Sequence, residues 1–416
     1  MHSKIVVEPP GHKAQAVIDR MASNCYNSTF VYPLVIEDGE GCYIRDVDGN
    51  VYLDFTSNIG ASPLGYRHPD VMDVLGEYSN IGAHKIAGQD FYCREHADLA
   101  ERLLSIAPSN FKAFFINSGA EAVENAIKIA YRRMGALPGV SCINAFHGRT
   151  LGALTFTFSK PVQKSNFPEL PVRRIRFCTS DDDPEIDAIE GMLKENKVAF
   201  IMTEIVQGEG GYNVASRRFI RRLREYADRY GTLLIVDEVQ SGMGRTGMWW
   251  AFEHYGITPD IMAVAKALQV GATLYRRDLD PMQQGVLSST WGGGSRIDLA
   301  IGARVIDVIK RDGLLSNARR MGDLLMKALA DLAEDSNGQM VDVRGIGLMI
   351  GVEFSSKDIR DRFMLNAFKH GLLLLPAGFK VIRVIPPLIV REEEVQEGVE
   401  LMYKALRLVA DAGGGI

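Results

Sequence analysis

Between about residues 110 and 265, short apolar runs alternate with segments of helical periodicity. The apolar runs have the length of strands, and they cover residues 113–116, 140–145, 197–206, 232–236 and 260–265. Such apolar runs are typical of strands that are buried on both faces, and strands that alternate with helices build a mostly parallel sheet. The pattern therefore predicts an α/β fold with helices flanking a mostly parallel sheet.

Helices between these runs have recognisable ends. Residues 119–133 follow the first run with helical periodicity. Ser216 has the side chain of a helix N-cap, and Gly231 suits the end of the same helix. The apolar face of this predicted helix consists of Phe219, Leu223, Tyr226 and Tyr230.

The two ends of the chain have a different pattern. Residues 43–55 predict a β-hairpin with Asp48 and Gly49 in its turn. The segments after residue 296 are a helical pattern over 297–334, strand-like runs over 347–354 and 380–385, and a closing helix over 392–408.

A chain of 416 residues with 46% hydrophobic side chains has material for two or three domains. We expect residues 59–295 to form a large cofactor-binding domain. Residues 1–58 and 296–416 are expected to form together a smaller α+β domain.

Charge and composition limit the partners of this chain. The net charge is −5 and both signs are mixed along the chain, so no basic face that could bind nucleic acid is expected. We interpret the five arginines between residues 217 and 224 as one solvated face of a helix. The first residues have no apolar stretch of a secretory signal, and no apolar run approaches the roughly 18 residues of a membrane span. The five scattered cysteines are typical of free thiols in a reducing compartment. We expect a cytoplasmic protein.

Asp237 closes the apolar run 232–236, where a carboxylate is costly unless it is paired or solvated. In open α/β sheets, ligands bind beyond the carboxyl ends of the strands. Asp237 could therefore bind a cation or a protonated ring nitrogen. A metal site shared with Glu238 is the alternative, but it would require a phosphate loop of the Gly-x-x-x-x-Gly-Lys-Ser/Thr type, which this sequence lacks. No metal site is expected.

Lys266 closes the next apolar run. Apolar surroundings lower the pKa of a lysine and make its amine a nucleophile, although a lone lysine in this position is usually structural. A lysine that can form an imine and a carboxylate that can pair with a pyridinium, here Asp237, are the two groups that pyridoxal phosphate requires.

Two segments suit the phosphate of such a cofactor. Residues 117–121, with Ser118 at a helix start, offer backbone N–H groups to an anion, or they simply cap the helix. Residues 288–294 combine hydroxyl side chains with glycines and suit either a phosphate or a turn. After the run 140–145, Phe146 could stack on a ring and Arg149 could bind a carboxylate, or both could have structural roles.

The glycines at 242, 244 and 247 fit the dinucleotide pattern Gly-x-Gly-x-x-Gly. That pattern must join a strand tightly to a helix. Five residues separate the preceding run from Gly242, and no helix start follows Gly247. We interpret this segment as a loop, and a nicotinamide-dependent oxidoreductase as the less favoured hypothesis.

The combination resembles the class III, fold-type-I aminotransferases, which include 4-aminobutyrate, ornithine, acetylornithine and lysine ε-aminotransferases. The resemblance extends over residues 31–408. Its most specific blocks are Asn117-Ser118-Gly119-Ala120-Glu121-Ala122, Phe146-His147-Gly148-Arg149-Thr150, Val206-Gln207-Gly208-Glu209-Gly210-Gly211, Asp237-Glu238-Val239-Gln240 with Gly244-Arg245-Thr246-Gly247, and Ala265-Lys266-Ala267.

The resemblance implies a role for each matched residue. Lys266 would be the Schiff-base lysine and Asp237 the partner of the pyridine nitrogen. The other cofactor residues that it implies are Ser118, Gly119 and Ala120 at the phosphate, Phe146 and His147 at the ring, Gln240 at the 3-hydroxyl, and Thr290 reaching the phosphate from the second subunit of a homodimer. Arg149 would bind a substrate carboxylate, and Glu209 would mask Arg383 while an ω-amine reacts.

The activity that the resemblance implies is transfer of an amino group from an ω-amino acid to 2-oxoglutarate. Gln269-Val270 after the lysine, and the run Ser289 to Gly293, are similar to the lysine ε-aminotransferase branch and favour lysine over 4-aminobutyrate as the donor. A racemase or aminomutase with the same fold and lysine remains the alternative.

Overall fold

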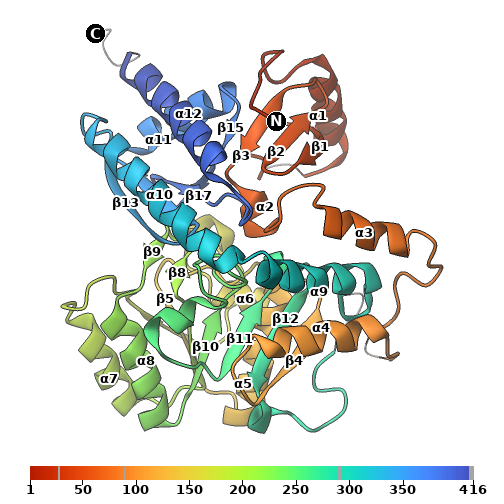
Figure 1. Cartoon of the computed structure of the whole chain (residues 1–416). Helices are drawn as coiled ribbons and strands as arrows, with labels where there is room; N and C mark the ends of the chain where they lie inside the picture. The colour runs from red at the N-terminus through yellow and green to blue at the C-terminus, as the bar shows by residue number, and fades with distance from the viewer. Residues whose placement is uncertain (27–28, 89, 289–291, 412–416) are drawn as a thin grey trace. The chain divides into compact units, whose positions relative to one another are not determined.

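The computed structural model describes residues 1–26, 29–88, 90–288 and 292–411, which divide into two compact units (Figure 1). The terminal unit consists of Met1–Pro69 and Ser316–Ile416, and the central unit of Asp70–Leu315. In the part of the chain that is described, no helix has the length and apolar character needed to cross a membrane.

A seven-stranded sheet forms the centre of the central unit, in the order β4-β12-β11-β10-β7-β5-β6. Its strands are β4 (Phe111–Ile116), β5 (Gly139–Cys142), β6 (Val172–Ile175), β7 (Phe200–Glu204), β10 (Leu233–Asp237), β11 (Ile261–Val264) and β12 (Gly271–Arg276). Strand β12 is antiparallel to both neighbours, and the other pairs are parallel. The predicted α/β fold with a mostly parallel sheet is confirmed. Because β4 and β11 are both antiparallel to β12, they run parallel to each other. The carboxyl ends of the six strands other than β12 therefore share one edge, called here the carboxyl edge.

Two of the predicted strands end earlier than expected. The run 140–145 leaves the sheet after Cys142, since Asn144 adopts a left-handed φ of 66° that a strand cannot contain. The run 197–206 is divided, because β7 ends at Glu204 and β8 (Val206–Gln207) pairs with β9 (Asn213–Val214) instead. Both interruptions free residues at the carboxyl edge for other contacts.

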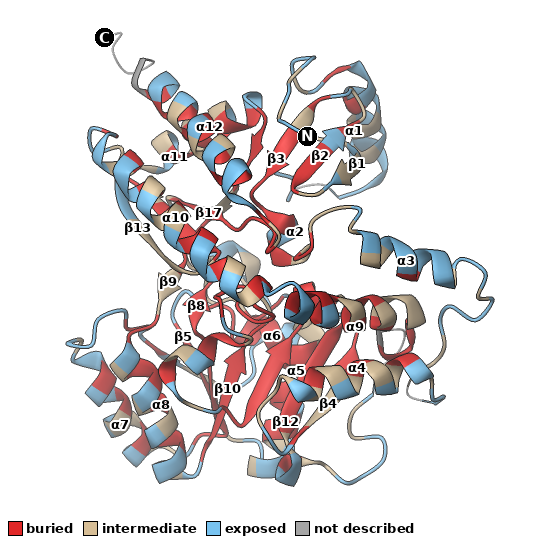
Figure 2. Cartoon of the chain, in the orientation of Figure 1, coloured by how far each residue is buried: buried red, intermediate tan, exposed pale blue. Residues whose placement is uncertain are grey.

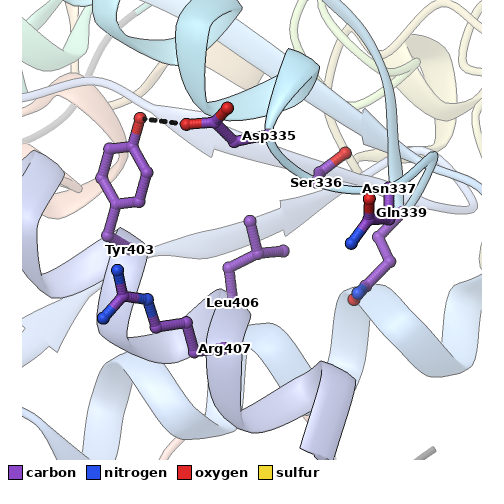
Figure 3. A pocket seen from close by; sticks show the side chains of 7 residues that line it. All are labelled: Asp335, Ser336, Asn337, Gln339, Tyr403, Leu406 and Arg407. Atoms are coloured by element: carbon purple, nitrogen blue, oxygen red, sulfur yellow. Dashed lines mark hydrogen bonds between the residues drawn. The ribbon is translucent and has the colours of Figure 1, made fainter.

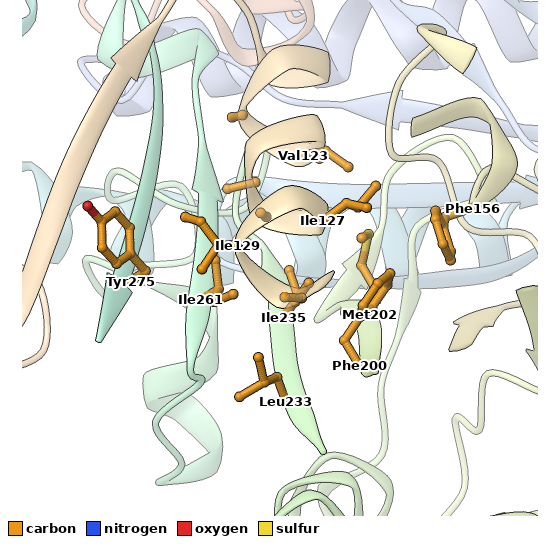
Figure 4. Close-up of a cluster of buried hydrophobic side chains, with 14 of the residues drawn as sticks. Val123, Ile127, Ile129, Phe156, Phe200, Met202, Leu233, Ile235, Ile261 and Tyr275 are labelled. Atoms are coloured by element: carbon orange, nitrogen blue, oxygen red, sulfur yellow. The ribbon is translucent and has the colours of Figure 1, made fainter. Parts of the chain in front are cut away.

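Helix α5 (Gly119–Met134) covers one face of the sheet (Figure 4). Its Val123 and Ile127 belong to one buried cluster with strand residues that include Met202, Ile235 and Ile261. Leu234 and Val236 alternate with Ile235 and therefore point to the opposite face, where they are also fully buried. Burying one such side chain stabilises the fold by about 1.5–3 kcal/mol, so both faces of β10 contribute to the core.

Helix α8 (Arg217–Tyr230) contacts β7 and β10. The Ser216 hydroxyl accepts the N–H of Phe219 at 3.1 Å, and Gly231 ends the helix with a left-handed φ of 63°, as predicted. Phe219, Leu223 and Tyr226 are buried, whereas the opposite side of the helix is exposed (Figure 2). The remaining helices around this sheet are α3 (Pro69–Tyr78), α4 (Arg94–Ser105), α6 (Leu151–Thr155), α7 (Glu185–Glu195) and α9 (Arg296–Arg311).

The helical pattern over 297–334 is not one continuous helix, and this part of the prediction was wrong. Helix α9 ends at Arg311 and α10 (Leu314–Glu334) begins three residues later. Gly313 lies between them with φ of 64°, a conformation that glycine adopts without steric cost. The central unit ends at Leu315, directly after this break.

The terminal unit contains two four-stranded sheets, β1-β2-β3-β15 and β13-β14-β17-β16. The predicted hairpin is confirmed as β2 (Tyr43–Asp46) and β3 (Val51–Asp54), with Gly49 in its turn at φ of 91°. The other strands are β1 (Ile36–Glu40), β13 (Met340–Ile346), β14 (Met349–Phe354), β15 (Leu372–Leu373), β16 (Leu375–Ala377) and β17 (Val381–Val384). The helices of this unit are α1 (His12–Asn24), α2 (Ser57–Gly60), all but the first two residues of α10, α11 (Lys357–Lys369) and α12 (Glu392–Asp411). The strand-like runs 347–354 and 380–385 and the closing helix are therefore present.

A polar hollow of about 300 Å³ lies in the terminal unit, between the turn that follows α10 and helix α12 (Figure 3). There the Tyr403 hydroxyl donates a hydrogen bond to Asp335 at 3.1 Å. Its lining residues are Asp335, Ser336, Asn337, Gln339, Tyr403, Leu406 and Arg407. None of the residues that the sequence analysis singled out lines this hollow.

Candidate active site

The carboxyl edge of the central sheet brings together residues from separate parts of the chain. Asp237 closes β10, and its register partners are Glu204 at the end of β7 and Ala263 in β11. Lys266 follows β11 with one residue between them, and Phe146 and His147 follow β5. One lysine, two acids and one histidine thus lie at strand ends, or just after them, along the same edge.

Asp237 is held by hydrogen bonds at both carboxylate oxygens. Oδ1 accepts the N–H of Val239 at 3.0 Å, and Oδ2 lies 2.7 Å from Nδ1 of His147. The His147 side chain is 0% exposed and that of Asp237 6% exposed. Burial by itself lowers the pKa of His147, but the hydrogen bond and the negative charge of Asp237 outweigh it and raise that pKa. The raised pKa reflects a hydrogen bond in which the Nδ1–H of His147 donates to the carboxylate of Asp237.

Sequence reasoning did not assign Glu204 to the site. Its Oε1 accepts the N–H of Gly208 at 2.9 Å, and its Oε2 accepts the N–H of Phe146 at 3.1 Å. Burial above all raises the pKa of Glu204 to about 7, and the charge of Asp237 acts in the same direction while that of His147 opposes it. The signal in the sequence was an acid after a mostly apolar stretch of strand length, similar to the signal that identified Asp237.

Lys266 begins a short 3₁₀ segment, Lys266–Leu268, directly after the fully buried strand β11. Its side chain is half-buried, and its backbone has φ of 51°, in the left-handed region that a non-glycine residue rarely adopts. Backbone strain of this kind costs about 1–3 kcal/mol and is concentrated at functional sites. The strain is compatible with a lysine placed for chemistry.

The first predicted phosphate segment forms the N-terminus of α5. The Ser118 hydroxyl accepts the N–H of Glu121 at 3.3 Å and thereby caps the helix. Space around this segment is narrow, because a Cβ atom on Gly119 would lie 2.8 Å from the Val239 side chain and one on Gly271 would lie 2.4 Å from the Ser118 carbonyl oxygen. Capping and anion binding both fit this geometry, since N–H groups of the first helical turn lack partners within the helix.

Residues on two further loops lie close to these groups. The guanidinium of Arg149 lies over the Phe146 ring, 5.9 Å from the ring centroid, and Arg149 is exposed. The Gln240 side chain accepts a hydrogen bond from the Tyr212 hydroxyl at 3.0 Å. Tyr212 was not predicted, and its left-handed φ of 58° is a feature that sequence alone does not reveal.

The proposed switch residues lie in different units. Glu209 of the central unit forms an ion pair with Lys160 at 3.8 Å. Arg383 of the terminal unit lies in β17, is 4% exposed, and donates from Nε and Nη2 to the Pro376 carbonyl at 3.1 and 2.7 Å. Thr290, together with Ser289 and Trp291 of the second phosphate candidate, lies outside the described residues.

The glycine segment 242–247 has no helix after it. It forms consecutive turns, and the next helical element is the short 3₁₀ segment Ala251–Tyr255. The strand-to-helix junction that a dinucleotide-binding loop needs is therefore missing here, as interpreted from the sequence. Among the described residues, no group of three or more His, Cys, Asp or Glu side chains could hold a metal ion.

Comparison with known families gives one match over most of the chain. The family described as "Aminotransferase class-III" matches residues 25–406. An acetylornithine aminotransferase from Archaeoglobus fulgidus is 39% identical, with 89% of this chain and 94% of that protein covered, and one from Methanosarcina mazei is 35% identical, with 94% and 96% covered.

Solved structures give a consistent result. A lysine aminotransferase from M. tuberculosis superimposes with a TM-score of 0.88 at 28% identity, covering 95% of this chain and 99% of that one. The ornithine aminotransferase from Toxoplasma gondii ME49 has a TM-score of 0.87 at 26% identity, with 97% of each chain covered.

Proposed function

The chain belongs to the class III aminotransferases, which use pyridoxal phosphate, and on this basis we propose that it transfers the ω-amine of a basic amino acid to 2-oxoglutarate. The relatives are named for acetylornithine, lysine and ornithine, and we propose a donor of this class, with 4-aminobutyrate as the alternative. The single observation that supports the chemistry best is the buried hydrogen bond between His147 and Asp237, where Asp237 closes β10, the neighbour of the strand that precedes Lys266.

The residues at the carboxyl edge fit this cofactor. Gly119 and Gly271 allow close packing around the first turn of α5, since a Cβ atom on Gly119 would lie 2.8 Å from Val239 and one on Gly271 would lie 2.4 Å from the Ser118 carbonyl oxygen. The N–H groups of that turn lack partners within the helix and suit a phosphate. We propose that Ser118, Gly119 and Ala120 bind the phosphate, that Phe146 and His147 lie at the ring, and that Gln240 contacts the 3-hydroxyl. When bound, pyridoxal phosphate supplies an electron-withdrawing ring that stabilises negative charge at the carbon bearing the substrate's amino group.

Asp237 would keep the ring nitrogen protonated. Val239 and His147 orient its carboxylate, with one hydrogen bond at each oxygen. In a site with little exposure, such a charge pair is stronger than in water. His147 therefore acts through Asp237 in this proposal.

Lys266 would hold the cofactor covalently and release it when a donor amine arrives. Its free amine would then take the proton from the substrate carbon and deliver it to the cofactor.

We propose Arg149 and Arg383 as the groups that bind substrate carboxylates, with Glu209 masking Arg383 while an ω-amine reacts. Arg383 is 4% exposed, and its hydrogen bonds from Nε and Nη2 to the Pro376 carbonyl oxygen fix the orientation of its guanidinium. We also propose a homodimer in which Thr290 of one subunit reaches the phosphate in the other.

The test is an absorbance spectrum of the purified protein with pyridoxal phosphate, before and after adding one amino donor without an oxo acid. The donors are N-acetylornithine, L-ornithine, L-lysine, 4-aminobutyrate and L-glutamate. Conversion of the visible band to the band of the aminated cofactor by one ω-amine, and its return with 2-oxoglutarate, supports the proposal. A visible band that no donor converts favours a racemase or aminomutase, which a chiral assay of single amino acids would then detect.

A further inference from the structure

Glu204 connects two loops of the candidate active site to the end of β7. Its Oε2 accepts the N–H of Phe146 at 3.1 Å, and its Oε1 accepts the N–H of Gly208 at 2.9 Å. His147 directly follows the first of these residues, and Glu209 directly follows the second. One side chain therefore determines where both loops leave the carboxyl edge.

This arrangement requires a carboxylate. A carboxylate accepts hydrogen bonds at both oxygens, whereas the amide of glutamine accepts at one and donates at the other. Glu204 is only 7% exposed and lies opposite Asp237 in the sheet register, so its charge is costly in this position. An uncharged side chain of the same shape would fill β7 equally well, but it could not hold both loops.

We propose that Glu204 is a positioning residue of the transamination site, which holds the Phe146–His147 loop and the Gly208–Glu209 loop through these two backbone hydrogen bonds. The inference rests on the proposed function, since that function is what gives His147 and Glu209 their roles. Glu204 acts through these loops.

The strength of this contact depends on the charge of Glu204. The titratable groups that face it are His147, Asp237 and the Cys142 thiol. Because the pKa of Glu204 is raised to about 7, the carboxylate holds both loops at pH 8, whereas at pH 6 it is largely protonated and one N–H loses its acceptor. Glu204→Gln reproduces the protonated form at every pH.

The first experiment measures amide hydrogen exchange in the cofactor-free protein, so it does not depend on activity. At pH 8, Glu204→Gln is expected to accelerate exchange by at least about tenfold in one of the two peptides, the one containing Phe146 or the one containing Gly208, because the amide keeps one acceptor and the other N–H loses its hydrogen bond to a charged group. At pH 6 the ratio of variant to wild type should approach one. Glu253→Gln is the matched control, because Glu253 also accepts a loop N–H, that of Trp250 at 3.1 Å, but lies outside the candidate site.

The second experiment measures the single-turnover reaction of the loaded protein with its donor. Glu204→Gln should slow this reaction at least about tenfold at pH 8 and less at pH 6, while Glu253→Gln should leave it unchanged. Unchanged exchange at Phe146 and Gly208 would overturn the proposal, and so would faster exchange with a normal reaction rate. If Glu204→Gln does not fold, Glu204→Asp, which is one methylene shorter, replaces it with the same expected results. A wild-type protein without transaminase activity would refute the proposed function, and the exchange data would still decide whether Glu204 holds the loops.

Discussion

Replacing Asp237 with asparagine removes the central charge of the candidate active site and retains its shape. The amide oxygen can still accept the N–H of Val239, now 3.0 Å from Oδ1. The amide nitrogen would face Nδ1 of His147, which lies 2.7 Å from Oδ2 in the native protein. A ring nitrogen that carries a hydrogen cannot accept a hydrogen bond there, so His147 would have to remove its hydrogen from Nδ1.

The magnitude follows from the burial of the pair, with side-chain exposures of 0% and 6%. Removing one partner of a buried ion pair costs about 3–5 kcal/mol. The loss of folding stability should be smaller, about 1–3 kcal/mol, since His147 can become neutral and asparagine keeps one hydrogen bond. The reaction also loses the charge that would face the cofactor's ring nitrogen. If the activation barrier rises by the same amount as for a broken buried pair, about 3–5 kcal/mol, the rate falls by roughly 10²- to 10⁴-fold.

The assay is the single-turnover reaction of the loaded enzyme with excess donor, followed by absorbance, alongside thermal unfolding. Asp260→Asn is the matched control. Asp260 is also buried and pairs with Arg224 at 2.9 Å and Arg276 at 2.6 Å, but it lies before β11, at the opposite edge of the sheet. The Asp260→Asn variant should be less stable than the wild type but should react at the same rate. If Asp237→Asn reacts within about threefold of the wild type, or no more slowly than Asp260→Asn, the assignment of Asp237 is wrong.

Three further predictions concern neighbouring features. Lys266→Ala is expected to abolish turnover while the protein remains folded, and near-normal turnover would disprove its role. Glu238 is fully buried and its pKa is raised from 4.5 to about 7, so the folded state retains a proton that the unfolded chain has lost. The contribution of Glu238 to stability therefore declines by about 3 kcal/mol as the pH rises from about 4.5 to 7. Glu238→Gln should flatten the measured dependence of the unfolding free energy on pH in that window. Gly271→Ala places a Cβ atom 2.4 Å from the Ser118 carbonyl oxygen and should weaken cofactor binding in a titration, whereas Gly191→Ala, with open space around it in α7, should bind normally.

The sequence alone was sufficient for features that depend on neighbouring residues. The alternating apolar runs predicted a mostly parallel sheet, Ser216 and Gly231 predicted the ends of α8, and Asp48-Gly49 predicted the hairpin turn. Caps and turns are local, because the groups that they satisfy lie within a few residues. The motif order was likewise enough to indicate the family, since each block combines residues with a known chemical role.

Other features were decided only by the tertiary structure. The sequence did not reveal that β12 inserts antiparallel between β4 and β11, because strand order depends on packing across the whole sheet. It did not show that His147 pairs with Asp237, a residue 90 positions away, or that Glu204 accepts two backbone N–H groups from separate loops. Such contacts arise where parallel strands end at the same edge, and a linear pattern of residue types contains no information on which strand ends become neighbours.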